Sequence, residues 1–369
     1  MKIQTESATK TANIIIDFFS NIDRIDDYFR LRKIERVKNL PAPIPGFGLE
    51  DDMFQNYDMH PEDMDIEVAQ IDNQTFNAML EKVASFSPDQ APGKELKLVV
   101  KEKNTNTLLG FIKLGSPIIN SKPRNNYLGD VPELTIFNQR AIMGFVIVPV
   151  QPFGFNYLGG KLMALICTSH KVREMLNDKY DTEFCLFETT SLYGNIKGMS
   201  MYDGLKPFLR FKGDTESKFV PTLGEEAYAS CKKIIEDDVQ GEIIHKDASS
   251  RKLKITTKMI SLIKSSLKET DMELHDKFVS AIKKAESVTT QKRFYMSDYG
   301  YENTRDVLLG KTETLIKGPN YHKHDLENII SWWKRKASSR YNKLKSEDRI
   351  REELEVWNAD TMNKIDIIR

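Results

Sequence analysis

The feature that most constrains the fold is a strand–turn–helix–strand pattern between Ala141 and Leu192. Residues Phe145–Val148 (FVIV) form a short, continuous apolar run, which is typical of a strand buried on both faces. Glycines and aromatic residues follow, and from Lys161 onward apolar residues recur at helical spacing. A second apolar run, Phe184–Phe187 (FCLF), comes next. The pattern predicts an α/β unit ordered as strand, Gly-rich turn, helix and strand.

The turn of this unit is a candidate anion site. The first N–H groups of a helix have no intrahelical partner, and the helix dipole adds partial positive charge there. Gly159 and Gly160 would let a pyrophosphate approach the backbone, and Lys161 would add a full charge. The alternative is that the glycines only permit a tight turn. The spacing matches neither a Walker A loop nor the glycine order of a dinucleotide-binding fold.

Composition narrows the class of protein. The formal net charge is zero over 369 residues, so a nucleic-acid surface would have to come from local patches. No apolar run approaches 18 residues and the first residues lack a signal-peptide pattern, so we expect no membrane span and a cytoplasmic location, in a bacterial host cell. Three scattered cysteines argue against a disulfide framework. His322 and His324 have no second cluster to complete a metal site, so no metal is expected.

The chain divides into three expected regions. Residues 1–90 are a helical N-terminal region with an acidic loop, 91–215 an α/β core, and 216–369 a helical C-terminal region with a basic segment. Within them the periodicity predicts a helix over 11–39, a helix over 74–86, a hairpin over 95–117, a last strand at 209–212, helices over 224–236 and 249–287, and last helices over 325–366. The acidic loop, residues 50–72, is either solvated or a flap that mimics nucleic acid or meets a basic partner.

The order of hairpin, strand, Gly-containing loop, helix and strand resembles the core of the GNAT acyltransferase fold. Residues Leu108–Ile112 (LLGFI) resemble its third strand, and Phe145–Pro149 (FVIVP) resembles its fourth. The following loop of that family carries [Gln/Arg]-x-x-Gly-x-[Gly/Ala], for which Asn156–Lys161 (NYLGGK) is the nearest fit, with Asn first and Lys last. The resemblance implies a GNAT-like central sheet and a site for acetyl-CoA or a related acyl-CoA. The implied cofactor residues are Val148, Val150, Asn156, Leu158, Gly159, Gly160 and Lys161.

A narrower resemblance is to the Druantia DruA-type proteins. The shared series, in order, is Gly115–Pro117, Arg124 before Tyr127–Gly129, Asn138–Arg140, Phe145–Pro149, Leu186–Thr190 and Gly198–Tyr202. It covers roughly residues 95 to 213. That family is also similar to the phage Mom-type enzymes, which modify adenine in DNA. The resemblance implies action on nucleic acid in phage–host conflict.

Candidate catalytic residues follow the second apolar run. Glu188 would be a general base on an amine or water, unless it caps a turn or pairs with Arg140 or Lys197. Tyr193 and Tyr202 would donate a proton to a leaving thiolate, as tyrosines do in the resembling enzymes, or would simply be packed aromatics.

Candidate nucleic-acid residues lie in two places. Arg124 and Arg140 would grip a phosphate in bidentate fashion. The segment from Trp332 to Lys345 is basic and contains no acid, so on a helix its cations would follow phosphates while Trp332 stacks on a base. Its candidate contacts are Trp332, Lys334, Arg335, Lys336, Arg340 and Lys343. The alternative is a solvated helix with its tryptophans in the core.

Two hypotheses on function result. The first is an acyltransferase or base-modifying enzyme that acts on nucleic acid, with DNA as the expected partner. The second is a catalytically inactive GNAT-like module that binds nucleic acid or a host protein, as a phage inhibitor or a structural component. The departures of Asn156–Lys161 from the family's loop pattern favour the second.

Overall fold

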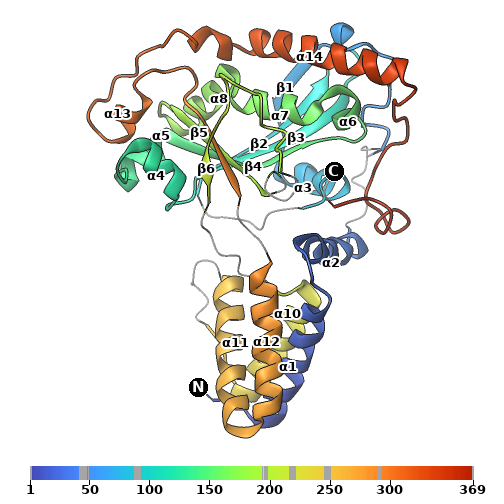
Figure 1. Cartoon of the computed structure of the whole chain (residues 1–369), viewed down its shortest axis with the longest axis vertical. Helices are drawn as coiled ribbons and strands as arrows, with labels where there is room; N and C mark the ends of the chain where they lie inside the picture. Colours follow the sequence, from blue (N-terminus) through green and yellow to red (C-terminus); the bar gives the residue numbers. More distant parts are fainter. Residues whose placement is uncertain are drawn as a thin grey trace. The chain divides into compact units, whose positions relative to one another are not determined.

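The computed structural model describes residues 2–40, 48, 50–86, 93–192, 194, 198–215, 222–244, 251–288 and 292–367. The chain forms two compact units (Figure 1). A helical unit combines Met1–Asn39, Ser217–Thr290 and Asp366–Arg369, and an α/β unit combines Leu40–Glu216 with Gln291–Ile365. Helices from the beginning and the later part of the sequence thus share one unit, whereas the sequence predicts three consecutive regions.

The α/β unit is built on a mixed sheet, which confirms the α/β class. In the described residues its strand order is β1-β2-β3-β4-β5-β7-β6. The strands are β1 (Ile66–Gln70), β2 (Glu95–Glu102), β3 (Thr107–Gly115), β4 (Ala141–Pro149), β5 (Leu186–Ser191), β6 (Arg210–Asp214) and β7 (Arg293–Ser297). Only β4 and β5 pair in parallel; the other neighbours are antiparallel. The β2–β3 hairpin and the apolar strands β4 and β5 are where the sequence predicts them.

The connection between β4 and β5 is helical almost throughout. It contains α6 (Phe153–Tyr157), α7 (Gly159–Cys167) and α8 (His170–Tyr180). The helix predicted from Lys161 is therefore two helices, because the Ser169 hydroxyl accepts a hydrogen bond from the Val172 amide and starts a new helix. The loop expected before it contains α6.

Helices cover both faces of the sheet. On one face α7 packs on β3 and β4, and α14 (Leu326–Ser346) packs over α6 and α7. On the other face α3 (Asn73–Val83) packs on β2, and its apolar residues join a separate core cluster with Val99, Phe111 and Val146. Two short helices, α4 (Lys122–Leu128) and α5 (Leu134–Arg140), lie in the β3–β4 connection. Single turns complete the unit at η1 (Pro61–Asp63), α13 (Thr304–Leu308) and η2 (Tyr321–His324).

Two predictions near the end of this unit were wrong. The strand at 209–212 is not the last one, because the aromatic-rich segment beginning at Arg293 forms β7 between β5 and β6. The last helix ends at Ser346 instead of continuing to about 366. Asp348 adopts a positive φ of 52°, and the Arg351 amide donates to the Asn156 side chain, so the backbone leaves the helical path there.

The helical unit consists of α1 (Thr5–Ser20), α2 (Ile25–Lys38), α10 (Glu225–Val239), α11 (Arg251–Thr270) and α12 (Met272–Ser287). The helix expected over 11–39 is thus two helices. Helix α1 contacts α10, α11 and α12. Its buried residues include Ala12, Ile15 and Phe19, and α11 contributes Met259 and Ile263 to the same kind of apolar core. The three cysteines are free and buried.

Candidate functional site at the carboxyl ends of the parallel strands

The parallel pairing of β4 and β5 ends before either strand ends. Their ladder stops at the Gly144–Thr189 pair, although β4 continues to Pro149 and β5 to Ser191. The Thr189 hydroxyl donates to the Gly144 carbonyl at 3.0 Å and closes the last paired position. In open α/β sheets, ligands bind beyond the carboxyl ends of parallel strands. This edge is therefore the first place to look for a functional site.

The predicted anion loop lies at this edge, at the start of α7, but side chains cover it. A Cβ atom on Gly159 would lie 2.6 Å from the Phe153 ring, and one on Gly160 would lie 2.6 Å from the Met201 sulfur. Leu158 precedes the helix in the left-handed conformation, with φ of 56°. Both glycines are buried, so here they permit close side-chain packing.

The other predicted cofactor residues are dispersed. Asn156 is fully buried and holds the segment after α14: its amide nitrogen donates to the Arg351 carbonyl at 2.7 Å, and the Arg351 amide donates back at 3.0 Å. Val148 and Val150 pack in the core cluster that the apolar residues of α3 join, with Val150 buried. Lys161 is half-buried, which lowers its pKa, and it lies near Asp203 and Lys336, whose charges act on its pKa in opposite directions.

Glu188 lies within β5, and its side chain and that of Thr189 point to opposite faces of the sheet, since side chains alternate along a strand. Its carboxylate is 3.2 Å from the Arg124 guanidinium, and neither side chain is exposed. Burial raises the pKa of Glu188 to about 7, and the Arg124 charge opposes this rise. Arg124 also donates to the carbonyls of Ile118 and Ile119. The predicted base and a predicted phosphate ligand thus form one buried ion pair.

The predicted tyrosines do not form an open proton-donor site. Tyr202 is buried, with its ring edge-on to Tyr295 at 5.3 Å, and burial raises the pKa of its hydroxyl. Tyr193 lies outside the described residues.

A polar cluster that the sequence did not predict lies beside Tyr202. The Tyr295 hydroxyl donates to Asp203 at 2.8 Å, and the Arg293 guanidinium lies 3.3 Å from the same carboxylate. Arg293 Nε also donates to the Tyr295 oxygen at 3.0 Å, and the Ser200 amide donates to Asp203 at 3.0 Å. Burial raises the pKa of Tyr295, so its hydroxyl keeps its proton at neutral pH. The alternation of β7 was the available signal, but partners about ninety positions apart are not visible in periodicity.

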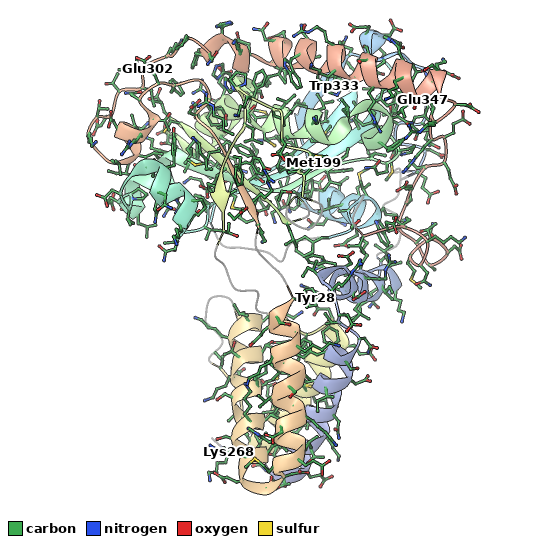
Figure 2. All side chains as sticks on the ribbon, in the orientation of Figure 1. Tyr28, Met199, Lys268, Glu302, Trp333 and Glu347 are labelled. Carbon is green, nitrogen blue, oxygen red and sulfur yellow. The ribbon has the colours of Figure 1, made fainter. Side chains whose placement is uncertain are left out.

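Helix α14 carries the predicted basic segment, and its two tryptophans have different surroundings. Trp333, labelled in Figure 2, is buried and donates from Nε1 to the Tyr157 carbonyl at 2.9 Å. Trp332 is half-buried, with its ring 5.9 Å from Phe208. The tryptophan pair therefore anchors the helix on the unit, which leaves the basic residues on its outer side.

We call these cations, together with the nearby Lys161, the α14 basic surface. Its members are Lys161, Lys334, Arg335, Lys336, Arg340 and Lys343. Among the described residues, only Lys343 of this set has a carboxylate within ion-pair distance, Glu347 at 3.9 Å. Burial, together with the neighbouring charges of Arg349 and Arg351, lowers the pKa of Arg340. Like charges gathered with few carboxylate partners make this surface electropositive.

An aromatic ring lies within the α14 basic surface. The Arg340 and Arg351 guanidinium groups lie over the half-exposed Phe155 ring, 4.6 Å and 3.8 Å from its centroid. Arg340 Nε also donates to the Phe155 carbonyl at 2.9 Å. These contacts fix the direction of two cations that would otherwise be mobile.

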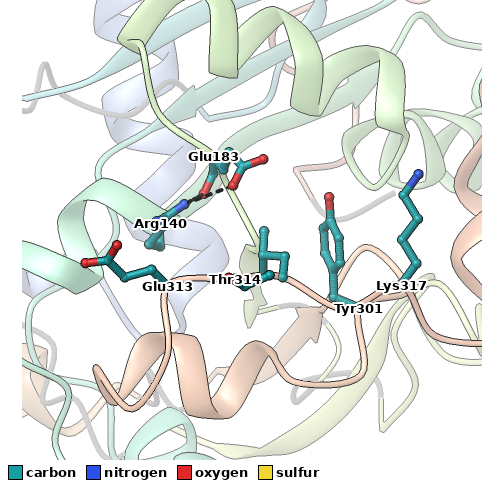
Figure 3. Close-up of a pocket in the computed structure, with 7 residues that line it drawn as sticks. Arg140, Glu183, Tyr301, Glu313, Thr314 and Lys317 are labelled. Carbon is teal, nitrogen blue, oxygen red and sulfur yellow. Dashed lines mark hydrogen bonds and ion pairs between the residues drawn. The ribbon is translucent and has the colours of Figure 1, made fainter.

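Arg140 lies apart from this site, at the end of α5 and directly before β4. It lines a shallow pocket of about 410 Å³ with Glu183, Tyr301, Glu313 and Lys317 (Figure 3). Its guanidinium donates to the Glu183 carbonyl at 3.1 Å and lies 3.6 Å from the Glu183 carboxylate. The pocket's two acidic and two basic side chains balance, so the geometry gives no preference for a phosphate.

Among the described residues, no three or more His, Cys, Asp or Glu side chains form a group that could hold a metal ion, and no helix has the length and apolar character needed to cross a membrane. Comparison with protein families matches residues 47–200 to the family model described as Druantia protein DruA. The match covers less than half of the chain, from before β1 to just beyond β5, and leaves out α14 and the helical unit. It confirms the DruA-type resemblance for that region. No curated protein and no solved structure matches the chain.

Proposed function

We propose that the chain is a DruA-type protein that binds DNA in phage–host conflict, with the α14 basic surface holding the phosphate backbone. The observation that carries the proposal is a line of cations along one helix with almost no carboxylate partners among the described residues. A solvated protein surface ordinarily interleaves both signs of charge. The family match supports the setting in phage defence.

The arrangement suits backbone recognition. Lys and Arg neutralise phosphates, and each neutralised phosphate releases condensed counter-ions, so affinity falls with salt. Arg340, held over Phe155, presents a fixed guanidinium, and Arg335 and Lys336 are exposed beside it. Such contacts position a protein on DNA without selecting a sequence. We therefore expect binding that is strongly salt-dependent and weakly sequence-dependent.

The test is a salt titration of duplex DNA binding. The variant Arg335→Gln/Lys336→Gln/Lys343→Gln removes three exposed charges without touching the buried anchor Trp333. Its slope of log affinity against log salt should become shallower by about 2 to 3. The control Lys10→Gln/Lys277→Gln/Lys311→Gln makes the same net change at lysines that are each paired with an acid. Equal slopes for the two variants would refute the proposal and favour a host protein as the partner.

The enzymatic function is the second candidate. It is supported by the core order, which resembles the GNAT fold, by the parting of β4 and β5, and by the polar cluster at that edge. In this structure Phe153 and Met201 occupy the space beside Gly159 and Gly160, so the residues present leave no room there for a pyrophosphate. Binding of acetyl-CoA or a related acyl-CoA stays a prediction, and it requires Met201 to move.

A further inference from the structure

The helical unit also has a cationic surface, which lies on helix α11 and is distinct from the α14 basic surface. Its buried side is apolar and includes Ile255, Met259 and Ile263. The opposite face carries lysines and small hydroxyl residues at spacings of three and four, which place them in one stripe. We call this stripe the α11 face; its members are Lys254, Lys258, Ser261, Lys264, Ser265 and Lys268. All are exposed except the half-exposed Lys264, and Figure 2 labels Lys268 near the end of the helix.

The α11 face contains no acidic residue, unlike the surfaces of the neighbouring helices α1 and α12. Several lysines elsewhere in the unit have carboxylate partners, among them Lys10 with Glu6 at 2.6 Å on α1 and Lys277 with Glu273 at 2.7 Å on α12. In α11 the single acidic residue, Glu269, lies 3.1 Å from Lys2.

The lysines of the α11 face contrast with these pairs. Within the described ranges, no carboxylate lies at ion-pair distance from Lys258, Lys264 or Lys268. A face of one charge sign has a self-repulsion that a partner of opposite charge relieves.

From these contacts we propose that the α11 face binds the phosphate backbone of duplex DNA. Lysine ammonium groups and serine hydroxyls both donate to phosphate oxygens. The short serine side chains let a rigid rod come close to the helix between the lysines. From Lys254 to Lys268 the stripe is about 21 Å long at 1.5 Å per residue, and duplex DNA carries one charge per about 1.7 Å of its axis, so several phosphates face it at once.

The residues of the α11 face also distinguish among polyanions. Proteins that grip single strands stack bases on aromatic side chains. The α11 face contains no aromatic residue, which favours a duplex read through its backbone. A membrane surface would require several apolar residues beside the lysines, and among the described residues of α11 only Leu253, at its beginning, is a large exposed apolar side chain. This surface is separate from the α14 basic surface and lies outside the matched family region, so the inference does not depend on the proposed function.

The experiment compares the full chain with two variants of equal net charge in binding to a duplex of about 30 base pairs. Lys258→Gln/Lys264→Gln/Lys268→Gln neutralises the α11 face, and glutamine keeps the helix because its helix propensity is close to that of lysine. Lys10→Gln/Lys277→Gln/Lys284→Gln is the control at ion-paired lysines of the same unit. Circular dichroism and thermal unfolding establish that both variants fold.

We expect the α11 variant to lose affinity about tenfold or more at low salt and its salt slope to become shallower by about 2 to 3, while the control changes little. A slope equal to that of the control would overturn the inference. An equal loss of binding to an acidic polypeptide, such as polyglutamate, would also overturn it, because the face would then attract any polyanion. If the α14 variant weakens DNA binding and the α11 variant does not, the inference on the α11 face fails and the α14 proposal stands. If the α11 variant weakens DNA binding and the α14 variant does not, the α14 proposal fails and the inference on the α11 face stands.

Discussion

The Glu188 carboxylate lies 3.2 Å from the Arg124 guanidinium, and neither side chain is exposed, so a complete ion pair is buried between β5 and α4. Arg124 Nε has no hydrogen-bond partner among the described residues, although its other nitrogens donate to Glu188 and to the carbonyls of Ile118 and Ile119. The Arg124 guanidinium also lies 4.0 Å from the Phe137 ring centroid. Buried pairs of this kind depend strongly on both partners.

The first prediction concerns those partners. At about pH 8, above the Glu188 pKa of about 7, Arg124→Met alone leaves an uncompensated buried carboxylate and should lower the free energy of unfolding by about 3 to 5 kcal/mol. The double change Arg124→Met/Glu188→Leu removes both charges and should recover most of the loss. Urea unfolding of the two variants measures this. A double variant no more stable than Arg124→Met would show that packing, not charge, sets the cost.

The second prediction is a pH dependence. Burial raises the pKa of Glu188 from its usual 4.5 to about 7, so the folded protein holds this proton more tightly than the unfolded chain does. Stability should therefore fall as pH rises from about 5 to about 7, by up to about 3 kcal/mol, since each pKa unit corresponds to about 1.4 kcal/mol. Chemical unfolding at several pH values should show this decline in the wild type and not in Glu188→Gln.

Glu102 is the matched control for the pH experiment. It is also buried, which would raise its pKa, but amide hydrogen bonds from Asp65 at 3.0 Å and Thr105 at 2.7 Å help to lower it below the usual value. Its contribution is present above pH 4.5 and is lost as pH falls through the folded pKa. Glu102→Gln should thus be destabilised at pH 7 and approach the wild type in acid, the opposite trend to Glu188.

Local sequence patterns predicted the elements that are defined by their own residues. The β2–β3 hairpin and the order β4, helix, β5 follow from periodicity within each segment. The site depends on partners that periodicity does not identify. Asp203 meets Tyr295 across 92 positions, and Asn156 meets Arg351 across 195. The position of β7 between β5 and β6 is likewise a long-range pairing, so the sequence predicts no strand there.

The third prediction is that substitutions at Gly159 and Gly160 change the stability of the protein by different amounts. Gly159→Ala places a Cβ against the Phe153 ring inside the core and should cost about 1 to 3 kcal/mol, because the ring has no free space to enter. Gly160→Ala meets the flexible end of Met201, which is 41% exposed and can turn away. Alanine also favours the helix, so this change should be close to neutral. Thermal unfolding of both variants tests the difference.

The fourth prediction concerns the clamp between α6 and the segment after α14. Asn156→Ala removes both hydrogen bonds to the Arg351 backbone and leaves a buried carbonyl and amide without their partner. We expect a loss of about 1 to 3 kcal/mol and faster proteolysis near residues 347–355. Asn358→Ala is a useful comparison, because that side chain bonds only within its own turn. Equal proteolysis in the two variants would contradict a clamp at Asn156.

The fifth prediction decides between the two candidate functions at the parallel-strand edge. If the sheet edge holds an acyl-CoA, shortening the side chain that covers Gly160 should make room for the pyrophosphate, and Met201→Ala should show a larger acetyl-CoA-dependent rise in melting temperature than the wild type. Gly160→Asp in the same background is the control, since its carboxylate would repel the phosphates and abolish the rise. Mass spectrometry of small molecules released from the denatured wild type gives an independent readout. Absence of any shift in wild type and Met201→Ala, with no bound CoA species, would remove the acyl-CoA candidate and leave DNA binding as the function to pursue.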